Sequence, residues 1–238
     1  MNISISKYRY ISKLVNSLLD LIYPPVCPIT NMELKDGESI ISNSIFYKFD
    51  IAGNPINIKN KKIDDYVEND FYFEDIYSLF SNFHESQELI HLIKYKKYFW
   101  VGEKIGIKLG EKILKETKIS YDYIIPVPLH KVKKRSRGFN QAFYIAQGIN
   151  SALKSEVKEE FITRAKYTIT QTKLKSKDRK ENLKEVFLVN LKYSDLLKGK
   201  NILIVDDVIT TGSTINSIAK ELSKYNPNRI DCATITLA

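Results

Sequence analysis

The sequence predicts an α/β protein with a mainly parallel sheet flanked by helices and a small N-terminal module. From about residue 76 onward, short strand-like runs alternate with amphipathic helix patterns, as in parallel α/β sheets. The run ILIV, residues 202–205, is aliphatic throughout, which is typical of a strand covered on both faces. Earlier residues lack this alternation. We therefore predict an N-terminal module over residues 1–75 and an α/β domain over residues 76–238.

The N-terminal module begins with helical spacing of apolar residues over residues 3–22, which ends at Pro24 and Pro25. Residues 26–60 are irregular, with short β-like runs such as SIFYKFDI. Residues 64–75 contain six acidic residues and no basic ones. This acidic stretch is either a surface turn or packs against basic residues elsewhere.

The α/β domain is predicted from alternating patterns along the chain. Helices are expected over residues 88–95, 101–116, 138–153 and 214–225. Strands are expected over residues 121–128, 161–165, 185–189, 202–207 and 229–238. Residues 166–184 carry few core-forming side chains, so we expect a long mobile segment there.

Composition restricts the class of protein. Hydrophobic residues make up 43% and charged residues 27% of the 238 residues, as in ordinary soluble proteins. No apolar run approaches the ~20 residues that span a bilayer, and MNISISKYRY does not resemble a signal peptide. We therefore expect a cytoplasmic protein without membrane insertion.

The basic excess lies in the second half of the chain. Residues 1–120 hold 16 Lys and Arg against 16 Asp and Glu, whereas residues 121–238 hold 21 against 12. The positive electrostatic potential of such a half would suit an anionic substrate, a nucleic acid or both. A solvated basic surface without a partner is the alternative.

The stretch ILIVDDVITTGST, residues 202–214, carries the strongest chemical signal. Asp206 and Asp207 follow the aliphatic run, at the predicted exit of a strand, where ligands bind in parallel sheets. Small hydroxylated residues around Gly212 then lead into a helix, an arrangement that binds phosphate. Paired carboxylates accept hydrogen bonds from a diol or bind a divalent metal. Together these features indicate a ribose 5-phosphate, whereas an ordinary helix cap needs only one such residue.

All thirteen positions from Ile202 to Thr214 resemble the phosphoribosyl pyrophosphate (PRPP) motif of type I phosphoribosyltransferases. The resemblance implies a type I phosphoribosyltransferase-like, Rossmann-like fold. It also implies that Asp206 and Asp207 hold the ribose hydroxyls and that Mg²⁺ arrives with the pyrophosphate. The implied 5-phosphate site consists of Thr210, Thr211, Gly212, Ser213 and Thr214.

Three further stretches are similar to the ComF family of competence proteins. They are YDYIIPVPLHKVKKRSRGFNQA (121–142), RAKYTITQTKLKSKDRKENLKEVF (164–187) and the ending ATITLA. The resemblance covers roughly residues 76–238. It implies a cytoplasmic protein that helps single-stranded DNA to enter during natural transformation. A ComFA-like DNA-translocating helicase and the inner-membrane DNA channel are its implied partners.

Two basic segments supply further candidate residues. Arg137 and Gly138 are the candidates for pyrophosphate contact, because a guanidinium binds the anion and a glycine permits close approach of the backbone. Residues 166–184 match the position of the family's flexible hood loop, where Gln171, Arg179 and Asn182 fit the family pattern. Disorder without a role is the alternative for this loop. The candidate DNA-binding residues are Lys131, Lys133, Lys134, Arg135, Lys173, Lys175, Lys177 and Lys180.

One departure from the family concerns zinc. ComF proteins usually begin with a four-cysteine zinc ribbon, but here Thr30 stands where a partner for Cys27 is expected, and no second cysteine pair follows. We expect a degenerate zinc-ribbon region that has lost its metal, so no zinc.

Several functions fit these patterns. A purine or pyrimidine salvage phosphoribosyltransferase is the main alternative to the DNA-uptake role, and a non-catalytic protein that binds PRPP or DNA is a third. The residues specify neither an acceptor substrate nor a catalytic acid or base, and a lone His130 beside a turn is more often structural.

Overall fold

The chain forms two compact units, residues 1–49 and 50–238. The computed structural model describes residues 24–35, 38, 41–48, 53, 56–57, 71–81, 83–95, 98–130, 134–135, 137–166 and 185–238. The helix predicted over residues 3–22 and most of residues 166–184 lie outside this part. The predicted boundary between residues 75 and 76 stays a prediction.

In the first unit, a tight turn surrounds Cys27. The Cys27 amide donates to the Met32 carbonyl at 2.8 Å, and the Asn31 amide donates back to the Cys27 carbonyl at 2.9 Å. Burial acts to raise the pKa of the Cys27 thiol, but hydrogen bonds, led by that of the Thr30 side chain, bring the pKa below its ordinary value. Thr30 thus contacts Cys27 in the place where a second cysteine was expected. Within the described residues, no group of three or more His, Cys, Asp or Glu is arranged to hold a metal ion.

The run SIFYKFDI was predicted to be β-like, and for residues 45–48 this was wrong, because they form helix α2 (Ile45–Lys48); residues 49–51 lie outside the described residues. Amides of Ile45 and Phe46 bond to the carbonyls of Ser42 and Asn43, both at 3.1 Å. The Ser42 hydroxyl also accepts from the Ser44 amide at 3.1 Å. Turn-forming side chains just before the apolar run therefore start one helical turn.

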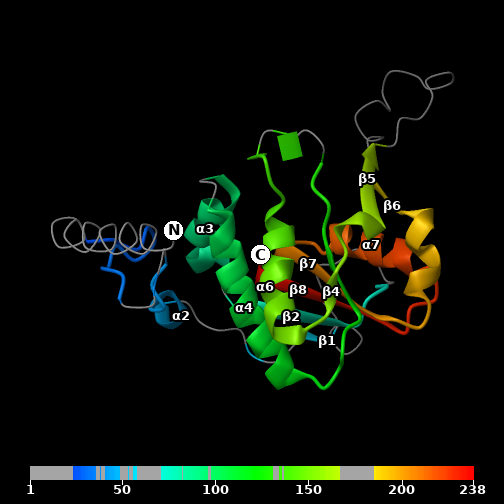
Figure 1. The fold of residues 1–238 in the computed structure, drawn as a ribbon, viewed down its shortest axis with the longest axis horizontal. Helices are drawn as coiled ribbons and strands as arrows, with labels where there is room; N and C mark the ends of the chain where they lie inside the picture. Colours follow the sequence, from blue (N-terminus) through cyan, green and yellow to red (C-terminus); the bar gives the residue numbers. More distant parts are fainter. Residues whose placement is uncertain are drawn as a thin grey trace, which may run out of the picture. The chain divides into compact units, whose positions relative to one another are not determined.

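In the described part of the second unit, six strands form a sheet with the order β1-β2-β8-β7-β3-β4. Five of these strands are parallel, and β1 at the edge is antiparallel. The strands are β1 (Ile56–Asn57), β2 (Asp75–Phe80), β3 (Tyr123–Pro126), β4 (Glu156–Val157), β7 (Asn201–Ile209) and β8 (Arg229–Leu237). The prediction of a mainly parallel sheet flanked by helices is confirmed (Figure 1). Strand β2 was not predicted, although DIYSLF is almost entirely buried.

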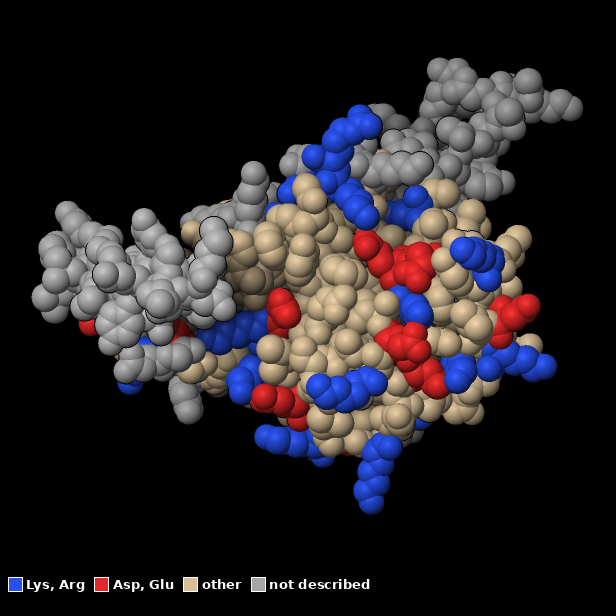
Figure 2. Space-filling view, in the orientation of Figure 1, with Lys and Arg blue, Asp and Glu red and all other residues tan. Residues whose placement is uncertain are grey.

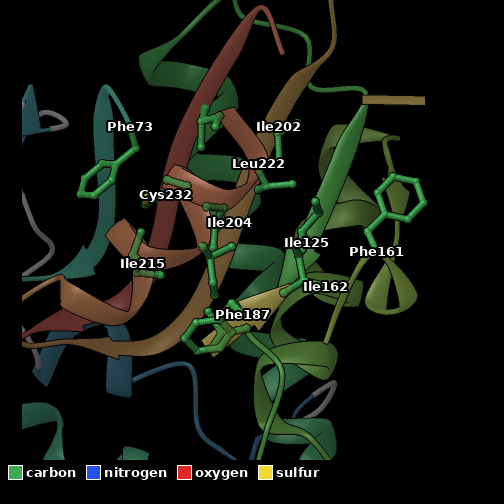
Figure 3. Packing of buried hydrophobic residues seen from close by; sticks show 14 of the residues in the cluster. Phe73, Ile125, Phe161, Ile162, Phe187, Ile202, Ile204, Ile215, Leu222 and Cys232 are labelled. Atoms are coloured by element: carbon green, nitrogen blue, oxygen red, sulfur yellow. The ribbon is translucent and has the colours of Figure 1, made fainter. Parts of the chain in front are cut away.

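Helices cover both faces of the sheet (Figure 1). On one face, α4 (Phe99–Glu116) packs along α6 (Gln141–Leu153), with α3 (Phe83–Tyr95) beside α4. On the other face lies α7 (Ser213–Ser223). Its Ile215 and Leu222 join strand residues such as Ile204 and Cys232 in one buried cluster (Figure 3). Successive strand residues point to opposite faces, so the unbroken aliphatic run of β7 supplies both cores.

The two predicted strands on either side of residues 167–184 pair with each other and stay outside the main sheet. β5 (Ile162–Lys166) and β6 (Glu185–Val189) form a two-stranded antiparallel ladder. Two 3₁₀ helices, η2 (Glu159–Phe161) and η3 (Leu191–Leu197), adjoin this ladder. Phe187 and Ile162 anchor it against the α7 face (Figure 3).

Glycines let the backbones of α4 and α6 pack directly against each other. A Cβ on Gly106 would lie 2.2 Å from the Ile145 carbonyl oxygen, and one on Gly148 would lie 2.0 Å from that of Glu103. Gly102, Gly106 and Gly110 of α4 lie next to Ile145, Gly148 and Ala152 of α6, respectively. The contacting positions rise in the same order along both helices, so α4 and α6 run parallel. Both helices therefore begin at the same end, the edge where the parallel strands end.

The opposite edge of the sheet holds a cluster of charges around Arg229. Its guanidinium pairs with Glu74 at 2.9 Å, Asp75 at 2.5 Å and Asp231 at 2.7 Å. Burial raises the pKa of the fully buried Asp231, although hydrogen bonds from Arg229 and Tyr121 oppose that rise. At its C-terminal end, then, the acidic stretch 64–75 packs against a basic residue of the second half. None of the helices in the described part of the chain is long and apolar enough to cross a membrane.

Candidate phosphate and ribose site

Asp206 and Asp207 lie within β7, where the strand extends past its neighbour β3. Pairing with β3 ends at Val205 opposite Pro126, whereas pairing with β8 continues to Ile209 opposite Leu237. The predicted strand 202–207 thus continues two residues further than expected, to Ile209, because β8 is long enough to keep β7 paired. The carboxyl groups lie beside the end of β3, where β7 no longer pairs with β3.

A chain of polar contacts fixes the Asp207 carboxylate, which is only 7% exposed. Lys94, at the end of α3, pairs with Asp207 Oδ2 through Nζ at 2.5 Å. The Gln141 amide lies 3.5 Å from Asp207 Oδ1, and the Arg137 guanidinium donates to Gln141 Oε1 at 2.7 Å. Elements distant in the sequence, α3 and the start of α6, thus converge on the acid pair.

The two carboxyl groups of the pair differ in environment. The Asp207 amide donates to Asp206 Oδ1 at 2.8 Å. Burial, followed by repulsion from the Asp207 carboxylate, raises the pKa of Asp206 well above its ordinary value, and Lys94 partly offsets this rise. The pair therefore favours a bound proton, a cation or a hydrogen-bond donor such as a sugar hydroxyl.

The phosphate candidates lie at the start of α7. Residues 210–212 form the turn, and Gly212 has a φ of 71°, which favours glycine. The helix predicted over residues 214–225 begins one residue earlier, at Ser213, so Ser213 and Thr214 both lie in the first turn of α7. Their amides are among the first of the helix, which have no partner within it and attract anions. The Thr211 hydroxyl donates to Ser213 Oγ at 3.0 Å.

A cavity of about 200 Å³ joins these features. Its lining includes both aspartates, the predicted Arg137 and Thr214, and three polar residues to which the sequence interpretation gave no role: Lys94, Gln141 and Arg164. The remaining lining residues are Val127, Pro128 and Leu129, from the end of β3. Three cationic and two anionic side chains thus face one cavity, a composition suited to an anionic sugar phosphate.

Gly138 follows Arg137 with a φ of 83°, and a Cβ there would meet no atom within 4 Å. Glycine at this position is thus required by backbone conformation rather than by crowding. Asn140 begins α6, because its Oδ1 accepts from the Ala142 amide at 3.2 Å, while its Nδ2 donates to the Val127 carbonyl at 3.2 Å. These contacts hold Arg137 and Gln141 next to the end of β3.

The other predicted residues divide into two groups. Lys134 and Arg135 are exposed, and Lys134 pairs with Glu159 at 3.2 Å. The remaining candidates lie outside the described residues: Lys131, Lys133, Gln171, Lys173, Lys175, Lys177, Arg179, Lys180 and Asn182. Of the missed residues, Gln141 and Arg164 stand within the family-like stretches, so a signal existed for both. Lys94 had none beyond its place at the end of an amphipathic helix.

Part of the chain is similar to known proteins. Residues 140–237 match the family model described as phosphoribosyl transferase domain. Competence protein F of Haemophilus influenzae is 33% identical over 147 residues, which are 60% of this chain and 63% of the relative. DNA utilization protein YhgH of Escherichia coli K12 is 33% identical over 138 residues, 56% of this chain and 59% of the relative. The chain thus spans about three fifths of the length of these curated relatives.

A purine phosphoribosyltransferase from Pyrococcus horikoshii is 21% identical, and the match covers 59% of this chain and 74% of that one, with a TM-score of 0.38. The ComF resemblance is confirmed by the curated relatives. Residues 140–237 are therefore similar to the phosphoribosyl transferase domain, and part of the chain is similar to competence protein F and to the DNA utilization protein YhgH.

Proposed function

We propose that the protein binds PRPP in the cavity at the acid pair and acts on single-stranded DNA during natural transformation. The observation that carries the first part is the convergence of Asp206, Asp207, Arg137 and the start of α7 on one cavity. The names of the curated relatives, competence protein F and DNA utilization protein, support the second part. In this role the protein works in the cytoplasm, and a DNA-translocating helicase and the inner-membrane channel are its proposed partners.

Each part of the ligand has a counterpart in the cavity. The acid pair accepts hydrogen bonds from the two ribose hydroxyls, and the amides and hydroxyls of Thr210–Thr214 hold the 5-phosphate. Arg137 binds the pyrophosphate, with Gly138 allowing the backbone to approach. Among the described residues, Lys94 is the cation that pairs with Asp207. The carboxylate oxygens of the acid pair also fit Mg²⁺ carried by the pyrophosphate. Magnesium would neutralise charge on the pyrophosphate.

If PRPP is turned over, the bond between C1 of the ribose and the pyrophosphate oxygen breaks and the electron pair leaves with pyrophosphate. Arg137 would stabilise the charge that develops on the leaving group. The cavity residues do not specify which acceptor would receive the phosphoribosyl group. Release of pyrophosphate with one particular base would favour a salvage enzyme, whereas binding of PRPP without turnover would favour a non-catalytic role.

The PRPP site is tested by the double variant Asp206→Ala with Asp207→Ala. Titration calorimetry with PRPP and Mg²⁺ should show binding to the wild type and none to the variant. A matched control removes two exposed carboxylates, with Asp195→Ala and Glu103→Ala, and should bind as the wild type does. Unchanged PRPP affinity in a folded acid-pair variant would refute the assignment.

The DNA role is tested by reversing the charge of Lys134 and Arg135, which are both exposed. Fluorescence anisotropy of a labelled oligothymidylate over a series of salt concentrations should show weaker binding and a shallower salt dependence, because fewer counterions are released. Deletion of the gene should abolish transformation without creating a requirement for a base. Transformation at the wild-type frequency would contradict the role in DNA uptake.

A further inference from the structure

Six aromatic side chains form a continuous cluster at the starts of α4 and α6. Ring centroids lie 4.5 Å apart for Phe99 and Tyr144, and 5.5 Å apart for Tyr98 and Trp100. Phe99 also lies 4.8 Å from Trp100 and 5.8 Å from Phe139. The aromatic cluster consists of Tyr98, Phe99, Trp100, Phe139, Phe143 and Tyr144.

None of these six residues is fully buried. Trp100 is 38% exposed, and the other five are partly exposed. Farther along the same helix pair, the contact is closed by Gly106, Gly148 and buried aliphatic residues such as Ile105. The contact between α4 and α6 is thus packed without aromatic rings. The rings instead lie at the starts of the two helices, where they remain partly exposed to water. Groups of partly exposed aromatic rings are typical of recognition surfaces.

The location of the cluster connects it to the proposed site. Because α4 and α6 run parallel and α6 follows β3, both helices begin at the edge where the strands end. Arg137 and Gln141, which line the cavity, are close neighbours of Phe139 in the sequence. The aromatic cluster therefore lies on the side of the domain that carries the cavity.

Exposed cations accompany the rings. Lys134 and Arg135 precede Phe139 by five and four residues, and both are exposed. Figure 2 shows Lys and Arg side chains standing above a largely uncharged area over the upper end of α6. Lys134 pairs with Glu159, but at side-chain exposures of 56% and 34% this ion pair is open to water and readily exchanged. Aromatic faces beside cations match a polymer that presents flat bases along an anionic backbone.

We propose that the aromatic cluster is a base-stacking surface for single-stranded DNA, with Lys134 and Arg135 contacting its phosphates. The proposal rests on the DNA-handling part of the proposed function and names the residues that touch the bases. Every base has a flat π face, so stacking accepts any sequence, as uptake of arbitrary DNA requires. Each ring that stacks should strengthen binding by about tenfold.

Trp100 gives a direct test, because it is the only tryptophan of the 238 residues. Stacking of a base on the indole should quench its emission as oligothymidylate is added to the full-length protein. Quenching that saturates together with the anisotropy of the labelled oligonucleotide supports the proposal. Unchanged Trp100 emission at saturating DNA would overturn the stacking surface while leaving DNA binding intact.

Substitution gives a second test. The double variant Tyr98→Leu with Trp100→Leu keeps apolar bulk and removes two π faces. Its affinity should fall ten- to a hundredfold at every salt concentration with an unchanged salt slope, because stacking releases no counterions. The control Tyr72→Leu removes a ring of similar exposure, 36%, outside the cluster and should bind DNA as the wild type does. Equal affinity of the double variant and the control would refute the proposal.

Two further outcomes are distinguishable from these. Absence of DNA binding by the wild type would defeat the DNA part of the proposed function and the stacking surface together, and would leave the PRPP site intact. A wild-type dimer that the leucine pair converts to a monomer, measured by light scattering, would identify the cluster as an interface between copies and overturn the stacking surface.

Discussion

Replacing Lys94 by methionine should destabilise the protein, because it removes the cation that pairs with Asp207. The substitution keeps most of the length and apolar character of the side chain and deletes only the charge. Lys94 Nζ lies 2.5 Å from Asp207 Oδ2, with side-chain exposures of 24% and 7%. The variant would leave two adjacent carboxylates without this ion pair.

The magnitude follows from distance and burial. At 2.5 Å and an effective dielectric constant of about 20, the gross attraction is about 7 kcal/mol, most of which desolvation of the two charges cancels. Breaking a fully buried pair costs about 3–5 kcal/mol, and exposed pairs contribute about 0.2–1 kcal/mol. Since Lys94 is partly exposed, we expect a loss of about 2 kcal/mol, or about 4–8 °C in Tm for a unit of this size.

The loss should depend on pH in a defined direction. Burial and the Asp207 charge already raise the pKa of Asp206, so the folded pair holds a proton more tightly than the unfolded chain does. Removing Lys94 raises the pKa of Asp206 further, because the Lys94 charge partly offsets that rise. The difference in stability between variant and wild type is therefore largest above the folded pKa of Asp206, and it shrinks as the pH falls and Asp206 takes up a proton.

Urea unfolding at pH 8 and pH 5 measures both effects. Lys108→Met is the matched control, because Lys108 pairs with Glu111 at 2.9 Å on the surface of α4, with exposures of 42% and 46%. The control should change stability by less than about 0.5 kcal/mol at either pH. A Lys94 variant that loses no more than the control at pH 8, or loses more at pH 5 than at pH 8, would refute the reasoning.

Four other substitutions test the fold by thermal or urea unfolding. Gly148→Ala should cost several kcal/mol or prevent folding, because its Cβ would lie 2.0 Å from a backbone oxygen of α4. Gly102→Ala should be neutral or stabilising by up to about 1 kcal/mol, because its Cβ would lie at an ordinary contact distance of 3.6 Å from its nearest neighbours. Equal stability of these two variants would contradict the close helix contact. Gly138→Ala should cost about 1–2 kcal/mol through its φ of 83° alone, and an unchanged midpoint would show that the turn relaxes. Arg229→Met should cost about 3 kcal/mol at neutral pH and less in acid, since protonation of the buried Asp231 relieves the uncompensated charge; a larger loss in acid would be contrary evidence.

The sequence was most informative where a pattern of neighbouring residues depends on a single local property, such as burial or phosphate binding. The aliphatic run 202–205 predicted a strand buried on both faces because such a strand needs apolar side chains on both. The acid pair and the hydroxylated turn were recognisable because phosphate and diol binding need those groups at that spacing. Patterns of this kind are read from neighbouring residues alone.

Errors of the sequence interpretation came from partners that lie far away in the chain. The extension of β7 past the acid pair depends on β8, to which it is paired up to Leu237. Strand β2 escaped prediction because its DIYSLF run follows an acidic stretch, and its parallel pairing with β8 crosses some 150 residues. SIFYKFDI has strand-like composition, but turn contacts from Ser42 override it.

The sequence by itself determined the class of ligand that we propose, because the residues proposed to bind a ribose phosphate are contiguous and carry their own chemistry. Only the tertiary structure decided what surrounds these residues. Lys94 comes from the end of α3, more than 100 residues before Asp207, and no local pattern marks it as a partner. The aromatic cluster likewise exists because Gly106 and Gly148 let two helices run side by side, which brings residues 98–100 next to residues 139–144. Packing, which depends on the whole chain, assembled both.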